Sequence, residues 1–543
     1  MHGENLLILF GEKKMKTIYY NGTILTMENL ETVQAVLVQD EKIIGIGKLN
    51  ELQEKAGKNV ELYDLRGKTL MPAFIDSHSH ITMAAQMSVF ADLTECVSFE
   101  QIISALKSYK EEKRKNTKKM IIGFGYDQNV LYEKCHPNKD ILDLVSRDIP
   151  VFILHVSGHM GVINSIGLKR LSITEKTENP EGGRIGRIKN SNIPDGYMEE
   201  TALMLLQYGF ADDMKMDIIT AIKKIQTLYL QNGITTVQDG ASSFQTIEMM
   251  KNFAKQGLLN LDVVSYPVLS NIEADFISDE DLNYKNHFRV GGYKIILDGS
   301  PQGKSAWLSI PYETEGGGQG YPWLSDKKVF DYCKKAVTEG RQILAHCNGD
   351  AASEQFLNCY GKAFQQVGKG QDLRPVMIHC QTERKDQIER MSKLNMIASF
   401  FVGHIYYWGD IHLENLGKER GMKISPVGTA LKNGVCITFH QDTPVTKPNM
   451  FHSIWCAVER KTRNGILLDQ EECVSVYEAL KAVTINAAYQ YHEEKKKGSI
   501  CIGKNADFII VNKNPMEIKI SDIKELKVDV TIKDGKIVYK RNI

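Results

Sequence analysis

The sequence predicts an α/β fold built on a (β/α)8 TIM barrel, and three observations favour it. Eight short apolar runs rich in β-branched residues recur from residue 71 onward. Amphipathic segments separate most of them, and alternation of strands with helices is typical of a parallel sheet. Side chains that can bind metals close several runs, at the end where such barrels carry their polar sites. The runs are residues 71–80, 233–240, 261–268, 290–300, 341–350, 374–380, 395–401 and 434–442. A doubly wound open sheet is the alternative.

The two ends of the chain carry strand-like runs of another kind. Residues 16–70 alternate strands and turns, as in TIYYNGTILTM, and residues 497–543 resume the pattern in GSICIGKNADFIIV. Each segment alone is too small to bury a sheet. We therefore expect both to pair into one β-sandwich that flanks the barrel, and we assign residues 71–80 and 221–496 to the barrel itself.

The interval between the first and second runs is unusually long. About 150 residues separate them, far more than one crossover helix needs. We expect an inserted α+β subdomain here, at residues 81–220, near the barrel mouth. A helical stretch at 100–118, apolar pieces such as KMIIGFGYD and PVFILHVSGHMGV, and the glycine-rich turn region NPEGGRIGR favour this reading.

Composition bounds the classes of function. Lys+Arg and Asp+Glu both number 67, so the chain lacks the basic excess that a nucleic-acid or membrane-surface partner would usually bring. The apolar run NLLILF, residues 5–10, falls short of the ~20 residues that span a bilayer. It also lacks a small-residue cleavage site, so we expect no signal peptide. The ten cysteines contain no CxxC pair, which favours reduced thiols and a cytoplasmic location.

The motif FIDSHSH at 74–80 places two histidines at the end of the first run. Side chains alternate faces along a strand, so His78 and His80 point the same way, as two imidazoles that share a metal ion must. Solvated surface histidines are the alternative for this pair alone. Later runs add four more side chains, all within a run or closing one: Lys294, His346, His379 and Asp442. Because barrel strands end at one rim, the sequence predicts that all six converge on a metal site.

Lys294 is an unusual residue for an apolar strand. An unpaired ammonium buried within GGYKIILDG would cost several kcal/mol. A side chain that points outward avoids this cost. Beside two metal ions, the neutral amine instead adds carbon dioxide and becomes a carbamate, whose two oxygens bridge the ions. Four imidazoles, a carbamate and a carboxylate suit two borderline divalent cations, for which we expect Zn²⁺, with Mn²⁺ and Fe²⁺ as alternatives.

The motifs as a set resemble the amidohydrolase superfamily. DSHSH, YKIILDGS, AHCNGD, VMIHCQ and FHQDTPV carry the likeness, and FGYDQN, SGHMGVINS and AVERKTRNG extend it over nearly the whole chain. More narrowly, the sequence resembles family 3, the branch with N-substituted formamide deformylases. The resemblance implies that the two histidines of the first run bind the more buried ion and the two later ones bind the other. It also implies that Lys294 bridges as the carbamate, that Asp442 contacts metal and hydroxide, and that a β-sandwich flanks the barrel.

The resemblance further implies a metal-dependent hydrolase of non-peptide carbon–nitrogen bonds, acting on linear N-substituted amides or formamides through a metal-bound hydroxide. We expect Asp442 to take the hydroxide proton and pass it to the leaving nitrogen. Cyclic amide hydrolysis and deamination on the same scaffold are alternatives, as is a catalytically silent binding barrel. Deamination is disfavoured because AHCNGD supplies Asp350 where one-metal deaminases carry glutamate. A small amide is the expected partner, and a homodimer the expected assembly.

Several weaker candidates complete the predicted site. Four side chains are expected to contact the substrate, although packing roles are the alternative for each: Tyr126, Gln128, His159 and His404. His440 shares a strand face with Asp442, which favours support of the metal ligands or contact with substrate. Asp298, four residues beyond Lys294, is expected to orient a loop. Aromatic residues at 400–408 favour a substrate with an aryl or alkyl group.

Overall fold

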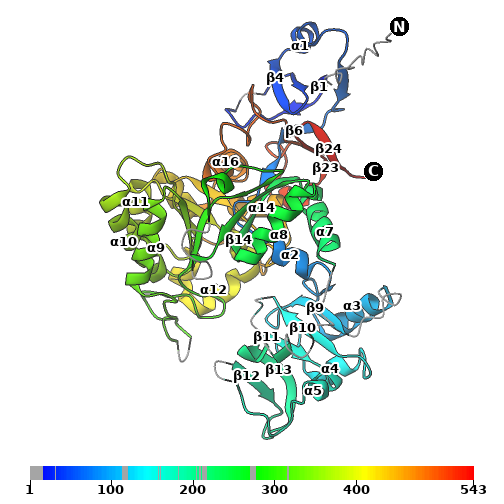
Figure 1. Ribbon diagram of the computed structural model, residues 1–543, viewed down its shortest axis with the longest axis vertical. Helices are drawn as coiled ribbons and strands as arrows, with labels where there is room; N and C mark the ends of the chain where they lie inside the picture. Colours follow the sequence, from blue (N-terminus) through cyan, green and yellow to red (C-terminus); the bar gives the residue numbers. More distant parts are fainter. Residues whose placement is uncertain are drawn as a thin grey trace, which may run out of the picture. The chain divides into compact units, whose positions relative to one another are not determined.

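The computed structural model divides the chain into two compact units (Figure 1). One holds the described residues up to Ile81 and those from Gln226 onward, and the other holds those of Thr82–Ile225. The structure describes residues 16–30, 32–112, 120–156, 158, 160–180, 183–203, 205–206, 210, 217–269, 277–314 and 317–542. Within these ranges, no helix is both long enough and apolar enough for a membrane span.

Parallel strands form the centre of the larger unit, and each of the eight apolar runs contains one. They make two sheets, in the orders β16-β15-β14-β7 and β17-β18-β19-β20-β21. A parallel bridge between Val268 and Lys294 connects β15 to β17. The strands are β7 (Phe74–Ile75), β14 (Ile234–Ser242), β15 (Asp262–Pro267), β16 (Phe288–Val290), β17 (Gly292–Ile296), β18 (Gln342–Cys347), β19 (Val376–His379), β20 (Ile397–Phe400) and β21 (Ile437–Phe439).

β17 begins at Gly292, where its backbone passes close to that of β18. A Cβ at Gly292 would collide with the carbonyl oxygen of Gln342 on β18, so only glycine permits this approach of the backbones. β17 pairs with β18 from this residue onward and begins the second sheet.

The first and last parallel strands approach each other at their carboxyl ends. The Asp442 amide donates to the carbonyl of His78 (3.2 Å), and the His80 amide donates to the carbonyl of Thr443 (2.8 Å). One core cluster also combines side chains from both sheets, including Ile75 of β7 with others of β15, β18, β19 and β20. These contacts hold the ends of β7 and β21 together.

Amphipathic helices cover the strands. In α8 (Phe244–Lys255), the Ser243 hydroxyl caps the first turn by accepting from the Thr246 amide, and the helix buries side chains at a spacing of three to four residues. Helices α9, α10 and α11 pack side by side (Figure 1). The helices are α7 (Ile218–Gln231), α9 (Asp326–Thr338), α10 (Asp350–Val367), α11 (Lys385–Lys393), α12 (Gly403–Met422), α13 (Val427–Lys432), α14 (Met450–Glu459), α15 (Val476–Ala482) and α16 (Ile485–Gln490).

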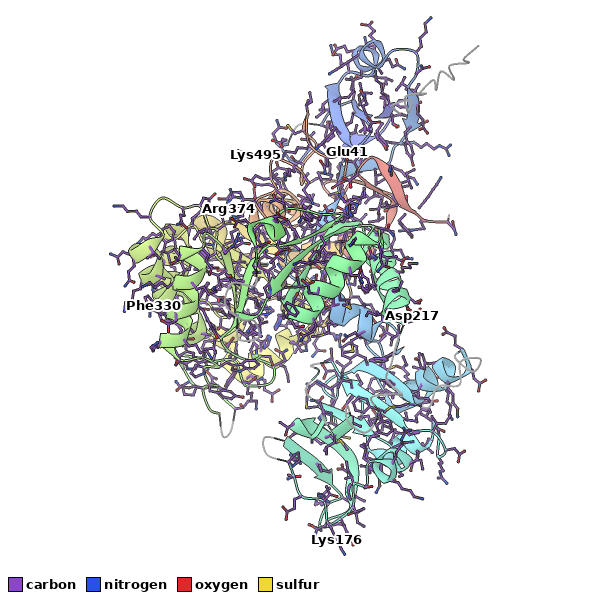
Figure 2. All side chains as sticks on the ribbon, in the orientation of Figure 1. Glu41, Lys176, Asp217, Phe330, Arg374 and Lys495 are labelled. Atoms are coloured by element: carbon purple, nitrogen blue, oxygen red, sulfur yellow. The ribbon has the colours of Figure 1, made fainter. Side chains whose placement is uncertain are left out.

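Ion pairs and a cation–π contact connect the segment after α16 to the parallel strands. Arg374, labelled in Figure 2, stands just before β19. Its guanidinium lies 3.6 Å from the ring centroid of Tyr489 and pairs with the Glu494 carboxylate at 3.0 Å. Further on, the buried ammonium of Lys497 pairs with Asp262 of β15. These contacts anchor the chain before it enters the C-terminal strands.

Both chain ends contribute to two further sheets of the larger unit. The first has the order β4-β3-β1-β5, and the second, β2-β6-β22-β23-β24, combines strands from both ends. Side chains of the two sheets share one hydrophobic core, with Tyr19 and Val36 from the first and Phe508 and Ile532 from the second. The elements are β1 (Lys16–Tyr20), β2 (Thr23–Ile24), β3 (Ala35–Gln39), β4 (Lys42–Gly47), α1 (Leu49–Ala56), β5 (Glu61–Asp64), β6 (Thr69–Pro72), β22 (Phe508–Val511), β23 (Val528–Lys533) and β24 (Lys536–Lys540).

The smaller unit contains a mixed six-stranded sheet of order β12-β13-β11-β10-β9-β8, with a hydrophobic cluster on each face. The expected helix at 100–118 is seen as α3, which ends at Glu112, and residues 113–119 lie outside the described ranges. The elements are α2 (Ile81–Met87), β8 (Ala91–Asp92), α3 (Phe99–Glu112), β9 (Ile121–Tyr126), α4 (Lys139–Asp143), β10 (Val151–His155), β11 (Met160–Ile163), α5 (Ser165–Arg170), β12 (Gly183–Arg187) and β13 (Pro194–Glu200).

Candidate active site

The Asp442 carboxylate is surrounded by histidines at the carboxyl ends of the parallel strands. Its Oδ1 lies 3.2 Å from Nε2 of His80 and 3.7 Å from Nε2 of His78, and its Oδ2 lies 4.0 Å from Nε2 of His379. One ligand atom each from His78, His379 and Asp442 fall within 4.8 Å of one another, close enough to share an ion. The chain thus brings together residues that are more than 360 positions apart.

The other two predicted ligands adjoin this group. The Lys294 amine lies 3.4 Å from Nε2 of His78, and its side chain is only 1% exposed. The His346 ring centroid lies 4.5 Å from that of His379. All six predicted ligands therefore form one connected cluster, which we call the strand-end cluster: His78, His80, Lys294, His346, His379 and Asp442.

Burial sets the protonation of the strand-end cluster. It lowers the pKa of His78 and His379 well below the usual value for imidazole, so both are neutral and can donate lone pairs. It lowers the pKa of the Lys294 amine to about 8, which leaves a neutral fraction near physiological pH. Burial alone would raise the pKa of Asp442, but the neighbouring His80, His78 and His379 together hold that pKa well below its usual range. The Asp442 carboxylate is therefore ionised.

Gln238 on β14 fixes the tautomer of His78. The Gln238 amide nitrogen donates to the Ser77 carbonyl (3.0 Å) and to the Tyr491 hydroxyl (3.1 Å), so the amide oxygen must be the atom that faces His78. That oxygen lies 2.5 Å from His78 Nδ1, which therefore carries the proton. Nε2 keeps its lone pair and faces the cluster, as a metal-binding histidine requires. Gln238 is not among the site residues predicted from the sequence.

Asp298 plays the same part for His346. Its Oδ1 lies 3.2 Å from Nδ1 of His346, and the carboxylate is fully buried. It also accepts hydrogen bonds from the backbone amides of Trp307 (3.0 Å), Asn348 (3.0 Å) and Gly349 (2.7 Å). Asp298 thus orients a loop and, in addition, the imidazole of His346. A carboxylate behind a histidine is a recurrent feature of metal sites.

Three residues at or next to the site adopt left-handed backbone conformations, which residues other than glycine rarely adopt. The φ angles are 81° at His379, 51° at Cys380 and 54° at Asp442. Each such residue costs on the order of 1–3 kcal/mol, and such strain concentrates at functional sites. At His379 and Asp442 the strained backbone belongs to the side chains that converge, which links the conformation to the geometry of the site.

A sequence model described as "Amidohydrolase family" matches residues 61–539. The chain belongs to the amidohydrolase family. Within it, the chain falls in the branch with N-substituted formamide deformylases, and it is a hydrolase of carbon–nitrogen bonds.

Several known proteins resemble this amidohydrolase over nearly its whole length. The N-substituted formamide deformylase of Arthrobacter pascens is 25% identical over 94% of this chain and 95% of its own. Protein LONG AFTER FAR-RED 3 of Arabidopsis thaliana is 25% identical over 96% of this chain and 91% of its own. An uncharacterized metal-dependent hydrolase from Pyrococcus horikoshii OT3 superposes with a TM-score of 0.74 at 24% identity, covering 93% and 99% of the two chains. That likeness shows a shared fold.

The remaining candidates of this amidohydrolase have different surroundings. His404 is buried, with Nδ1 at 3.1 Å from Nε2 of His412, and its ring packs on Phe401, which in turn faces His379. In the smaller unit, the Tyr126 hydroxyl bonds to Nδ1 of His136 at 3.0 Å. Two further candidates belong to that unit: Gln128, whose buried Oε1 has no hydrogen-bond partner among the described residues, and His159, which lies outside them. Their predicted contacts with substrate stay predictions.

Proposed function

We propose that this amidohydrolase uses divalent metal ions, held by the strand-end cluster, to hydrolyse linear N-substituted amides or formamides. One observation carries the proposal. The buried Oδ1 of Asp442 has no hydrogen-bond partner among the described residues, although imidazole nitrogens surround it. With the lone pair of His78 turned toward the same space, several electron-pair donors face one another, and a cation is the group that such a set stabilises.

The residues present fit two ions. His78 and His80 would hold one, and His346 and His379 would hold the other. Lys294, as its carbamate, and Asp442 would supply carboxylate oxygens to the ions. The lowered pKa of the Lys294 amine supports carbamate formation, because only the neutral amine adds carbon dioxide. Imidazole with carboxylate oxygen favours Zn²⁺, with Mn²⁺ and Fe²⁺ as alternatives. A bound divalent cation supplies Lewis acidity toward a carbonyl and lowers the pKa of water.

Asp442 moves the proton in the proposed reaction. Its low pKa keeps the carboxylate ionised, so Oδ1 can accept a proton from the water that attacks the amide carbon. The same oxygen then delivers that proton to the departing nitrogen as the carbon–nitrogen bond breaks. The products are a carboxylic acid, formic acid for a formamide, and an amine. His404 is proposed to contact the substrate, and its aromatic neighbours Phe401 and Trp408 favour an apolar substituent.

The fold proposed to carry this site is a closed (β/α)8 barrel with a flanking β-sandwich from both chain ends and an inserted subdomain. Support comes from the chain-order sequence of parallel strands and from the backbone hydrogen bonds that link the ends of β7 and β21. The ten cysteines are all free, which supports a reducing, cytoplasmic environment. We propose a homodimer as the assembly.

Metal analysis and a substrate panel test the proposed function. The purified enzyme should contain divalent metal, and it should hydrolyse linear N-substituted formamides faster than hydantoins or lactams. Removal of the metal with a chelator should abolish turnover, and its return should restore it. Metal-free protein with unchanged activity would contradict the proposed chemistry, and preference for the cyclic amides would contradict the proposed substrate class.

A further inference from the structure

A chain of hydrogen bonds leads outward from His379 to a backbone carbonyl. His379 Nδ1 lies 3.3 Å from Nε2 of His440, and His440 Nδ1 lies 2.9 Å from the Ser399 hydroxyl. The Ser399 hydroxyl lies 3.2 Å from that of Ser77, which donates to the carbonyl of Phe439 at 2.9 Å. All four side chains are at most 3% exposed, so the chain of bonds is shielded from water. We call these four residues the relay.

The Phe439 carbonyl at the end of the relay fixes which atom donates in each of its hydrogen bonds. A carbonyl only accepts, so the single hydroxyl proton of Ser77 is committed to Phe439. Ser77 must then accept from Ser399, which commits the hydroxyl proton of Ser399 as well. The Ser399 oxygen is consequently the acceptor for Nδ1–H of His440.

The direction continues through the two imidazoles. His440 is fully buried, and its two hydrogen-bond partners, a hydroxyl and an imidazole, carry no charge, so a cationic ring is disfavoured. With its one proton on Nδ1, His440 presents a bare Nε2 that accepts from Nδ1–H of His379. The proton of His379 is thereby held on Nδ1, and its Nε2, 4.0 Å from Oδ2 of Asp442, keeps its lone pair.

We propose that Ser77, Ser399 and His440 are positioning residues that fix His379 in the tautomer able to bind metal. This inference rests on the proposed metal site. It also gives a role to β20, which supplies none of the six ligands but contributes Ser399. FIDSHSH has a double role as well, because it supplies two ligands and, through Ser77, the relay's anchor for a third ligand on another strand.

Removal of the Ser399 hydroxyl tests the relay. In Ser399→Ala, Nδ1–H of His440 has no acceptor, so the opposite tautomer, which places the proton of His379 on Nε2, becomes competitive. We expect divalent metal affinity, measured by chelator competition, to fall about 10- to 100-fold. Ser399→Thr keeps the hydroxyl and should bind metal nearly as the unchanged enzyme does.

Ser265→Ala is the matched control. Ser265 is a buried serine on β15 that bonds to the hydroxyl of Ser242 at 2.5 Å, outside the relay. This variant should bind metal with unchanged affinity, even where its thermal stability drops. Unchanged affinity in Ser399→Ala would overturn the relay, and so would equal losses in Ser399→Ala and Ser399→Thr.

Neutron diffraction of the unchanged enzyme reads the tautomers directly, independently of the variants. Deuterium should appear on Nδ1 of both His379 and His440, and the Ser399 hydroxyl should point toward Ser77. Deuterium on Nε2 of His440 would overturn the inference. The failures are distinguishable: an unchanged enzyme that binds no divalent metal refutes the proposed function, whereas normal binding with the opposite tautomers refutes only the relay.

Discussion

Replacing Gln238 by leucine would remove three buried hydrogen bonds, but among the described residues it would leave only one group without a partner. The Ser77 carbonyl still accepts from the Gln490 amide (2.8 Å), and the Tyr491 hydroxyl still donates to the carbonyl of Asp76 (2.8 Å). Nδ1–H of His78 has no substitute. Leaving one such donor unsatisfied costs about 1–3 kcal/mol in the free energy of unfolding.

The same change should weaken metal binding more than it weakens the fold. Without Gln238, His78 can move its proton to Nε2, the atom that faces Asp442, so we expect a loss of about 10- to 100-fold in metal affinity. Chelator competition measures the affinity, and urea unfolding of the metal-free protein measures the stability. Gln238→Glu, which keeps an acceptor for His78, serves as the control. Metal binding in Gln238→Leu as tight as in the unchanged enzyme would refute the assignment of the His78 tautomer.

Three further predictions concern charge. Asp442→Asn removes the proton acceptor, so kcat should fall by about 10²–10⁴-fold, and a smaller loss in the metal-loaded variant would contradict general base catalysis. The pKa of Lys294 is lowered from 10.5 to about 8, so between these values the unfolded chain holds a proton that the folded metal-free chain lacks. Stability of the metal-free protein should therefore rise with pH across this window relative to Lys294→Met, and parallel profiles in pH-dependent urea unfolding would count against the buried amine. Lys497→Met removes one cationic partner from two buried carboxylates, Asp262 and Glu493, which keep Lys533 and Arg289 as partners. In urea unfolding it should cost less than the about 3–5 kcal/mol of an uncompensated buried charge, but more than Lys497→Arg.

The convergence of the strand-end cluster could be predicted from the sequence for a physical reason. Polar residues that close apolar runs are visible in the sequence, and parallel strands in chain order bring their ends to one edge. Gln238 could not be predicted in the same way. A glutamine inside a β-branched run can face the site or lie on the opposite face of the strand, and the sequence does not distinguish the two. The roles of Ser77 and Ser399 depend on contacts across more than 320 residues of separation, which no local pattern encodes.

Other features depend on tertiary contacts that a single sequence does not reveal. The left-handed conformations at His379 and Asp442 are set by the surrounding structure, because neither residue type requires them. The close approach of Gly292 to β18 is another such contact, which a sequence with many glycines cannot single out. The pairing of His404 with His412 likewise depends on how the two rings are turned along α12, which the sequence does not show.

Anomalous diffraction from crystals of the purified enzyme at the zinc, manganese and iron edges tests the central claim most directly. We predict two anomalous peaks among the side chains of the strand-end cluster, and continuous density for a carboxyl group beyond the amine of Lys294. A map with no peak in that cluster, and with an unmodified amine, would contradict the metal-dependent hydrolysis proposed for this protein.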